Sequence, residues 1–271
     1  MILLSPSKDM HQTVSFSGQI DSLDKRSRKL SEALSEGLRA LNENELQNYY
    51  GISSSLTQEV LAWLVSPPVT PIPAGLMYQG EAYKSLAWES LNTKVQEASR
   101  NGLTILSALY GPVGPFTGLY PYRLDLTLPL PKDIRKDQGV RSLKGLWIPI
   151  VRELLTERIQ VQGLTHLISA CSGEFQGLLE PFDSWPVPLI TTEFLQKDMV
   201  LGGLKKISTR IKQARGFFVR WALECIASTS SEKNGRDMLM RKLKGFSLNG
   251  YKFSSSLSTD WSWTFVQEER S

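Results

Sequence analysis

The residues best suited to do chemistry in this sequence stand just after short apolar segments. Ser5 and Lys8 follow the first apolar run of the chain, and Ser172 and Glu174 follow a later one at 165–170. Short apolar runs of this kind predict buried strands. Ligands collect where strands end if helices cover the faces of the sheet. We therefore expect a hydroxyl, an ammonium and a carboxylate at strand ends, in position to meet a ligand.

Two of these side chains could act as acids, bases or anion binders. Lys8 provides a point charge for a phosphate or a carboxylate, and a desolvated lysine can serve as a base or a nucleophile. Glu174 provides a carboxylate for proton transfer. Each also has a simpler interpretation, because Lys8 could be a solvated loop lysine and Glu174 could stabilise a helix N-terminus.

A basic helix late in the chain supplies a second group of candidates. The pattern of residues 211–227 is helical, and it places Lys212 and Arg215 three residues apart on one face. Residues 201–244 hold eleven Lys and Arg against three acids, although the net charge of the whole chain is only +4. This asymmetry favours a phosphate-bearing or polyanionic partner, with a solvated basic face as the alternative. Gly216 costs about 1 kcal/mol in a helix relative to Ala, which indicates close packing or the approach of a ligand.

Aromatic and cationic residues also surround a proline turn at 120–123. Arg123 is suited to clamp a phosphate, and Tyr122 is suited to stack on a base. An ion pair between Arg123 and Asp125 is the structural alternative. The pattern of residues 122–126 looks extended.

Several common site classes are disfavoured. Neither His11 nor His166 stands in a known catalytic signature, and the glycine-rich stretch 111–118 matches neither nucleotide-binding pattern. No Cys/His pair has zinc spacing, so we predict no metal and no cofactor. Two cysteines, Cys171 and Cys225, fit a reducing cytoplasm. No apolar run reaches about 18 residues and no signal peptide is recognised, so we predict a cytoplasmic protein without a membrane partner.

Strand and helix patterns mix without a regular βαβ rhythm. We therefore predict an α+β fold, a single domain over residues 1–271 with a central mixed sheet flanked by helices. A helical subregion at about 24–66 ends at a proline-rich connector, 67–73. The predicted strands lie at 1–4, 76–79, 103–109, 165–170, 187–191, 251–253 and 261–265. The predicted helices lie at 24–41, 44–51, 54–64, 92–102, 142–159, 211–227 and 232–243, with turns at 80–83 and a loop at 111–118.

Taken in order, seven segments resemble the YaaA family of bacterial peroxide-stress proteins. Leu4-Ser5-Pro6-Ser7-Lys8 is similar to the family's I-S-P-A-K, and Gly80-Glu81-Ala82-Tyr83 is similar to G-D-V-Y. Leu106-Ser107-Ala108-Leu109-Tyr110-Gly111 resembles L-S-G-L-Y-G, and Pro121-Tyr122-Arg123-Leu124-Asp125 resembles P-Y-R-L-E. Ser172-Gly173-Glu174-Phe175 resembles S-D-E-Y, Lys212-Gln213-Ala214-Arg215-Gly216 resembles K-K-A-R-G, and Gly250-Tyr251 resembles a late G-Y.

The chain looks like a diverged member of that family. The family's Arg-Pro after L-Y-G is Gly114-Pro115 here, and its F-W-G is Leu146-Trp147-Ile148. The resemblance implies a YaaA-like α+β domain with a positively charged cleft, a helix-hairpin-helix-like element, DNA binding and a role in limiting peroxide damage. The binding set that it implies is Ser5, Lys8, Tyr110, Tyr122, Arg123, Ser172, Lys212 and Arg215.

Two functions fit these residues. The first is a DNA-binding protein of the peroxide-stress response, whose cations neutralise phosphates and whose affinity falls with salt. The alternative is an enzyme acting on a small phosphorylated or nucleoside-like substrate, with Lys8, Glu174 and Lys212 as catalytic acid/base candidates. A carboxylate repels phosphates, so Glu174 in the cleft would favour the enzyme. The oligomeric state is not predicted.

Overall fold

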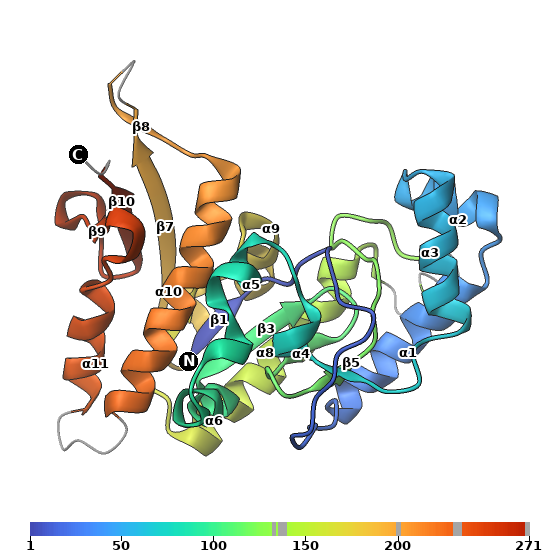
Figure 1. The fold of residues 1–271 in the computed structure, drawn as a ribbon, viewed down its shortest axis with the longest axis horizontal. Coiled ribbons are helices and arrows are strands. Elements are labelled where there is room, and N and C mark those ends of the chain that lie inside the picture. Colours follow the sequence, from blue (N-terminus) through green and yellow to red (C-terminus); the bar gives the residue numbers. More distant parts are fainter. Residues whose placement is uncertain (132–133, 135–139, 199–201, 230–234, 269–271) are drawn as a thin grey trace.

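A mixed eight-stranded sheet forms the centre of the fold (Figure 1). The computed structural model describes residues 1–131, 134, 140–198, 202–229 and 235–268. The strand order is β4-β3-β1-β6-β7-β10-β9, and β8 pairs with the far end of β7. The strands are β1 (Ile2–Leu4), β3 (Leu103–Ser107), β4 (Gly111–Val113), β6 (Leu167–Ser169), β7 (Leu189–Lys197), β8 (Leu204–Lys205), β9 (Tyr251–Phe253) and β10 (Ser262–Gln267).

The five central strands β3, β1, β6, β7 and β10 are parallel, and β4, β8 and β9 pair antiparallel at the margins. The chain leaves β1 toward β3 on one side, whereas it leaves β6 toward β7 on the other side. β1 and β6 are neighbours, so their carboxyl ends flank a topological switch point, where open sheets of this kind bind ligands. The residues that follow β1 and β6 are therefore the first candidates for a ligand site.

Helices cover the sheet and extend beyond it at one end. They are α1 (Lys25–Arg39), α2 (Glu43–Tyr50), α3 (Ser54–Val65), α4 (Ala74–Met77), α5 (Glu81–Leu86), α6 (Thr93–Gly102), α8 (Leu143–Gln162), α9 (Gly173–Gln176), α10 (Ser208–Thr229) and α11 (Gly235–Lys244). We call α1, α2 and α3 the helical cap. Figure 1 shows the cap at the opposite end of the molecule from α11. None of the helices in the described part of the chain is long and apolar enough to cross a membrane.

Local capping explains where the cap helices begin and end. Asp24 accepts a hydrogen bond from the Arg26 backbone N–H at 2.8 Å and so caps α1 at the start of the predicted helix 24–41. Asn42 and Glu45 form a reciprocal capping box at the start of α2. Gly51 ends α2 in the left-handed conformation with φ of 61°, and Ser53 caps α3. α2 and α3 are therefore joined by a short connection, residues 51–53.

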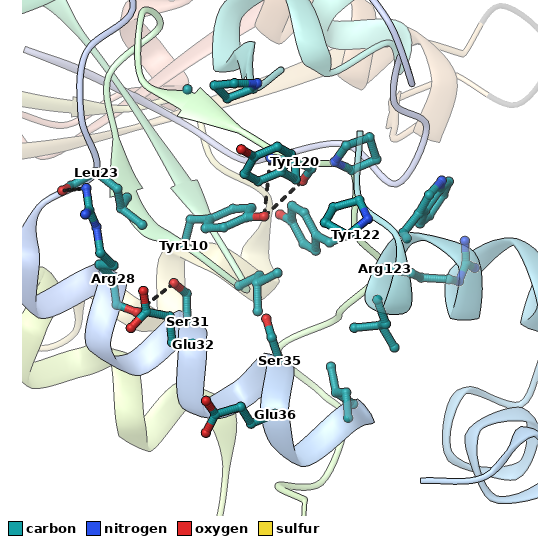
Figure 2. A pocket seen from close by; sticks show the side chains of 18 of the residues that line it. Leu23, Arg28, Ser31, Glu32, Ser35, Glu36, Tyr110, Tyr120, Tyr122 and Arg123 are labelled. Atoms are coloured by element: carbon teal, nitrogen blue, oxygen red, sulfur yellow. Dashed lines mark hydrogen bonds between the residues drawn. The ribbon is translucent and has the colours of Figure 1, made fainter. Parts of the chain in front are cut away.

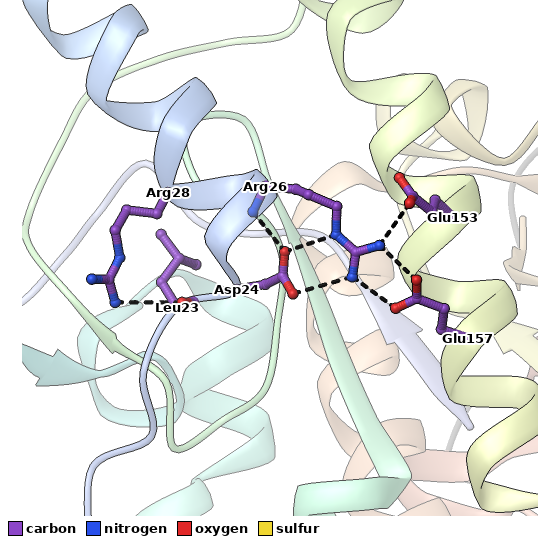
Figure 3. Close-up of polar contacts among 6 residues, drawn as sticks. All are labelled: Leu23, Asp24, Arg26, Arg28, Glu153 and Glu157. Carbon is purple, nitrogen blue, oxygen red and sulfur yellow. Dashed lines mark hydrogen bonds and ion pairs between the residues drawn. The ribbon is translucent and has the colours of Figure 1, made fainter.

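One arginine ties the cap to the rest of the fold (Figure 3). The Arg26 guanidinium contacts Glu153 at 2.8 Å and Glu157 at 2.6 Å, both on α8, as well as the side chain of Asp24 at 3.1 Å. Hydrogen bonding to Arg26 lowers the pKa values of Asp24 and Glu157. This network fixes the N-terminal end of α1 against α8.

The core under α10 is aromatic. The ring of Phe194 on β7 stacks on that of Phe265 on β10, with centroids 5.5 Å apart, and both contact Phe218 of α10. Phe246 and Tyr251 complete the cluster. Because these rings are fully buried, they hold α10 firmly against the sheet, together with the cationic side chains that it carries.

The α+β class with a central mixed sheet flanked by helices is confirmed, while a single domain over the whole chain stays a prediction. The strands predicted at 1–4, 103–109, 165–170, 187–191, 251–253 and 261–265 are present with shifted bounds, as are the predicted helices. Residues 232–234 of the last predicted helix lie outside the described residues. Residues 122–126 pair with no strand in the part of the chain that the structure describes.

Three predicted segments are wrong. Residues 76–79 form no strand, because 74–77 make the helical turn α4, and a short apolar run does not distinguish the two. The predicted turn at 80–83 begins helix α5. The predicted loop at 111–118 contains β4 and β5 (Gly118–Leu119), and β5 pairs with β2 (Ile72–Pro73). The reason is Gly111, whose φ of 68° allows a tight hairpin; a Cβ there would lie 2.3 Å from the Trp147 ring.

Candidate functional site

A cavity of about 500 Å³ opens at the carboxyl ends of β1 and β6, within the size range of small-molecule sites. We call it the switch-point cavity. It gathers eight of the nine residues singled out from the sequence: Ser5, Lys8, Tyr122, Arg123, Ser172, Glu174, Lys212 and Arg215. The ninth, Tyr110, lines a neighbouring cavity instead.

Backbone and hydroxyl groups join the two strand ends at this cavity. The Ser172 backbone N–H donates to Ser5 Oγ at 2.7 Å, and the two hydroxyl oxygens are 3.2 Å apart. The Tyr83 hydroxyl donates to the Ser5 carbonyl at 2.8 Å. The loop after β1 is thus held against both β6 and α5. A preorganised loop of this kind limits the entropy lost when a ligand binds.

Lys8 pairs with Asp125, the acid that the structural alternative paired with Arg123. Lys8 Nζ lies 2.8 Å from Asp125 Oδ2, and the two side chains are 58% and 24% exposed. Arg123 makes no hydrogen bond or ion pair with any described residue, so the pairing of Arg123 with Asp125 is not observed. Lys8 therefore lies at the cavity with its charge paired, while no described residue accepts a hydrogen bond from Arg123.

Glu174 combines a structural contact with a perturbed acidity. Its Oε1 accepts a hydrogen bond from the Leu126 backbone N–H at 3.0 Å. Partial burial raises the pKa of Glu174, and the nearby charge of Asp125 adds to this effect. Glu174 also lies in the first turn of α9, as its simpler interpretation required. A carboxyl that holds its proton more tightly than usual is suited to general acid catalysis.

The side chains from α10 complete the cavity. Arg215 is largely buried, and its Nε is a buried donor without a hydrogen-bond partner in the described structure. Burial lowers the pKa of Arg215, yet a guanidinium stays charged in proteins. An unsatisfied buried donor costs about 1–3 kcal/mol. Lys212 is exposed. Arg215 Nε is thus a donor at the cavity that lacks an acceptor among the described residues.

The cavity is balanced in charge rather than cationic. Four cations, Lys8, Arg123, Lys212 and Arg215, share its lining with four acids, Asp9, Glu81, Asp125 and Glu174. Part of the basic excess of the late segment is also neutralised by acids outside it, through the ion pairs Lys205–Asp198 and Lys206–Glu193. The lining therefore gives no support to the expected positively charged cleft.

Part of the switch-point cavity is formed by residues that were not singled out from the sequence. The Glu81 carboxylate accepts from Gln213 of α10 at 2.7 Å and pairs with Lys84, and these bonds lower its pKa. Ser7 Oγ accepts from the Gly80 backbone N–H at 2.9 Å. In the sequence, the only signal for this segment is the family-like motif Gly80-Glu81-Ala82-Tyr83, for which no functional role was predicted.

The tyrosines are fixed by their own hydrogen bonds. The Tyr122 hydroxyl is 2.8 Å from Ser107 Oγ and 3.2 Å from the Tyr78 hydroxyl, and burial raises the pKa of Tyr122 to about 12. The Tyr110 hydroxyl donates to the Tyr120 carbonyl at 3.0 Å. Both hydroxyls are used within the protein, so Tyr122 can offer a ligand its ring only.

Cysteine and metal chemistry find no support among the residues that the structure describes. Burial raises the pKa of the Cys171 thiol to about 11, so this thiol is protonated near neutral pH. His166 lines a different cavity, next to the N-terminus. No group of three His, Cys, Asp or Glu within the described ranges is placed to hold a metal ion.

The fold and cavity define an α+β protein with a mixed-charge cavity at a topological switch point. A model of the family described as "Peroxide stress protein YaaA" matches residues 1–257, so the chain belongs to this family, as its motifs indicated. It is similar to UPF0246 proteins of Desulforapulum autotrophicum (28% identity; 87% of this chain and 85% of the relative), Ruegeria sp. (27%; 98% and 99%) and Caulobacter vibrioides (26%; 99% and 99%).

Proposed function

We propose that this member of the peroxide-stress family acts in the cell by binding a small phosphate-bearing molecule in the switch-point cavity. The observation that carries the proposal is the buried Nε of Arg215, which lacks an acceptor, together with the unused donors of Arg123. Guanidinium groups bind phosphate and carboxylate oxygens in paired geometry. An anionic group between these two arginines would satisfy donors that the described structure leaves open.

The acids of the cavity favour a small ligand over a polyanion. Asp125 pairs with Lys8, and the Glu81 carboxylate accepts a hydrogen bond from Gln213 of α10. Negative charge therefore lies both beside Lys8 and beside α10, which carries Lys212 and Arg215. A single phosphate needs only the two guanidiniums of the lining as partners, whereas a DNA backbone would bring many phosphates close to the acids around the cavity. The balanced lining therefore supports the small-ligand function better than the DNA-binding function.

Chemistry on the bound molecule follows from the same residues. Glu174 would act as the proton donor, because its pKa is raised and it lines the cavity beside Lys8. Lys8, held by Asp125, and Lys212 would stabilise negative charge as it develops on the ligand. We propose these three as the catalytic set if the bound molecule is turned over.

DNA binding is the second candidate. One observation favours it: Lys8 and Lys212 are exposed at this cavity. Under this hypothesis, the affinity for duplex DNA falls steeply with salt concentration, and loss of Lys212 lowers the slope of that dependence.

Calorimetric titration separates the two candidates. We would titrate the protein with inorganic phosphate, nucleoside monophosphates and a short duplex DNA, at low and at physiological salt. The proposal expects saturable binding of a phosphate compound that weakens about 10- to 100-fold in Arg215→Gln, as for the loss of a charged hydrogen-bonding group. Arg158→Gln is the matched control, because Arg158 is also largely buried but bonds Thr104 outside the cavity. Binding of DNA alone would contradict the proposal.

A further inference from the structure

A second cavity, of about 530 Å³, lies beneath the helical cap (Figure 2). We call it the cap cavity. Its walls come from α1, α3 and the segment that carries Tyr110 and Tyr120, and Figure 2 shows these tyrosines facing α1 across it. Five aromatic side chains line it: Tyr50, Trp63, Tyr110, Tyr120 and Tyr122. The function proposed above makes no use of this cavity.

Tyr50 stands apart from the other tyrosines that surround the cap. Its hydroxyl is buried, yet it has no hydrogen-bond partner among the residues that the structure describes. The adjacent Tyr49 hydroxyl donates to the Pro129 carbonyl at 2.6 Å, and the Tyr110 hydroxyl is bonded to the Tyr120 backbone. Burial raises the pKa of Tyr50 above its usual range, so the phenol keeps its proton. Tyr50 therefore lines the cap cavity with a neutral O–H group that no described residue uses.

The two cavities meet at Tyr122 and Arg123, which line both of them. The charge of Arg123 also acts on the Tyr50 hydroxyl, where it opposes the effect of burial on the pKa. Arg123 is thus within electrostatic reach of Tyr50 while it also borders the switch-point cavity. A ligand with two parts could contact both residues.

The charges of the cap cavity indicate which part of a ligand it accepts. Glu32 and Glu36 lie four residues apart on α1 and border the cavity, and both are exposed. The lining also holds Arg28, Arg39 and Asp21, and each of them has a partner. Arg39 Nε donates to the Leu64 carbonyl at 2.7 Å, and Arg28 donates to the Leu23 carbonyl at 3.5 Å. Asp21 pairs with Arg100 at 2.7 Å, which leaves Glu32 and Glu36 as the acids open to a ligand. Carboxylates repel an anion but accept hydrogen bonds from amino groups. An aromatic wall with carboxylates and one unused phenol fits a neutral, planar nitrogen heterocycle.

We infer that the cap cavity holds the heteroaromatic ring of the ligand whose anionic group occupies the switch-point cavity. The anionic half of this inference rests on the proposed function, whereas the ring half rests on the cap cavity alone. Arg123 contacts the linkage between the two halves, and the Tyr50 hydroxyl bonds an acceptor or donor on the ring edge. The ligand class is a nucleoside phosphate or a compound of the same two-part chemistry.

The test compares Tyr50→Phe with Tyr49→Phe. We would titrate each variant with inorganic phosphate and with the nucleosides and nucleoside monophosphates of the four common bases. In Tyr50→Phe, the affinity for the best nucleoside and its monophosphate should fall about 3- to 10-fold, the effect of one neutral hydrogen bond. The affinity for inorganic phosphate should not change. In Tyr49→Phe, the nucleotide affinity should be retained.

Melting of the free protein gives an independent readout. Removing an unsatisfied buried hydroxyl should leave the melting temperature of Tyr50→Phe unchanged or raise it, whereas Tyr49→Phe loses its bond to Pro129 and should melt lower. A structural role for the Tyr50 hydroxyl would lower both melting temperatures alike, and that result would overturn the inference.

The failures of the two proposals are distinguishable. If nucleosides bind with a dependence on Tyr50 but phosphate does not bind, the ring site stands and the function proposed for the switch-point cavity fails. If phosphate binds with a dependence on Arg215 but Tyr50→Phe leaves every nucleotide affinity unchanged, the proposed function stands and this inference is refuted. If no nucleoside binds at all, the inference is refuted as well.

Discussion

Gly216 sets the distance between α10 and α5, and the replacement Gly216→Ala should disturb both stability and the cavity. A Cβ built at this position would lie 1.9 Å from the Ala82 carbonyl oxygen and 2.8 Å from Ser85 Cβ. Carbon–oxygen contacts are ordinarily about 3.3 Å or longer. The backbone of α5 would therefore have to move by about 1.4 Å, because a carbonyl group cannot rotate away as a flexible side chain can.

The expected magnitude combines two opposing effects. Alanine stabilises a helix by about 1 kcal/mol relative to glycine. Overpacking typically costs about 1–3 kcal/mol, and contact with a helix backbone belongs at the upper end of that range. We expect a net destabilisation of about 1–2 kcal/mol, which lowers the melting temperature by roughly 2–8 °C in a protein of this size. α5 and α10 both line the switch-point cavity, so ligand affinity should fall at temperatures where the variant is still folded.

Differential scanning calorimetry measures this effect, with Gly173→Ala as the matched control. Gly173 is also a helical glycine, in α9, but a Cβ added there meets nothing within 4 Å. The control should melt no lower than the natural protein. If Gly216→Ala melts as high as the natural protein or higher, the close approach of α5 to α10 does not constrain the structure, and the reasoning is refuted.

Three further perturbations have defined outcomes. Because the pKa of Glu174 is raised above 4.5 in the folded protein, its ionisation opposes folding. The natural protein should therefore lose stability relative to Glu174→Gln as the pH rises above about 4.5, measured as the difference between their melting temperatures. A difference that stays constant with pH would contradict the burial of this carboxyl. Tyr122→Phe removes the hydroxyl that contacts Tyr78 and Ser107, although Ser107 Oγ keeps the backbone N–H of Tyr110, and should cost about 1–3 kcal/mol in urea unfolding. An unchanged stability would contradict this network. Cys171, with its pKa of about 11, should react with a thiol reagent at neutral pH only on unfolding, and rapid labelling of the native protein would exclude the buried, protonated thiol.

Local patterns predicted much of the secondary structure because local physics determines it. The predicted helices 24–41 and 92–102 are present, and Asp24 caps the first while the second ends at Gly102, since capping and helix termination depend on a few neighbouring residues. The turn that became α5 and the loop that contains β4 were wrong for the opposite reason. Both depend on distant partners: α5 packs on α10, and Gly111 makes its hairpin against Trp147 of α8.

The candidate residues could be predicted from the sequence, but which of them contact one another could not. Ser5 and Ser172 are separated by 167 positions, and nothing local in the sequence states that β1 and β6 are neighbours. The sequence likewise offered Arg123 as the partner of Asp125, although Lys8 takes that place. No sequence pattern pointed to Tyr50, because the lack of a partner for its hydroxyl among the described residues depends on the three-dimensional arrangement of the side chains around it.

The most direct test of the central claim is a calorimetric titration of nucleoside monophosphates and inorganic phosphate into the natural protein and into Arg215→Gln. The account predicts saturable binding to the natural protein at physiological salt. It predicts binding about 10- to 100-fold weaker in the variant and unchanged binding in Lys94→Ala, which removes an exposed helical cation that does not line the cavity. Equal affinities for the natural protein and Arg215→Gln, or heat released only with duplex DNA, would contradict it.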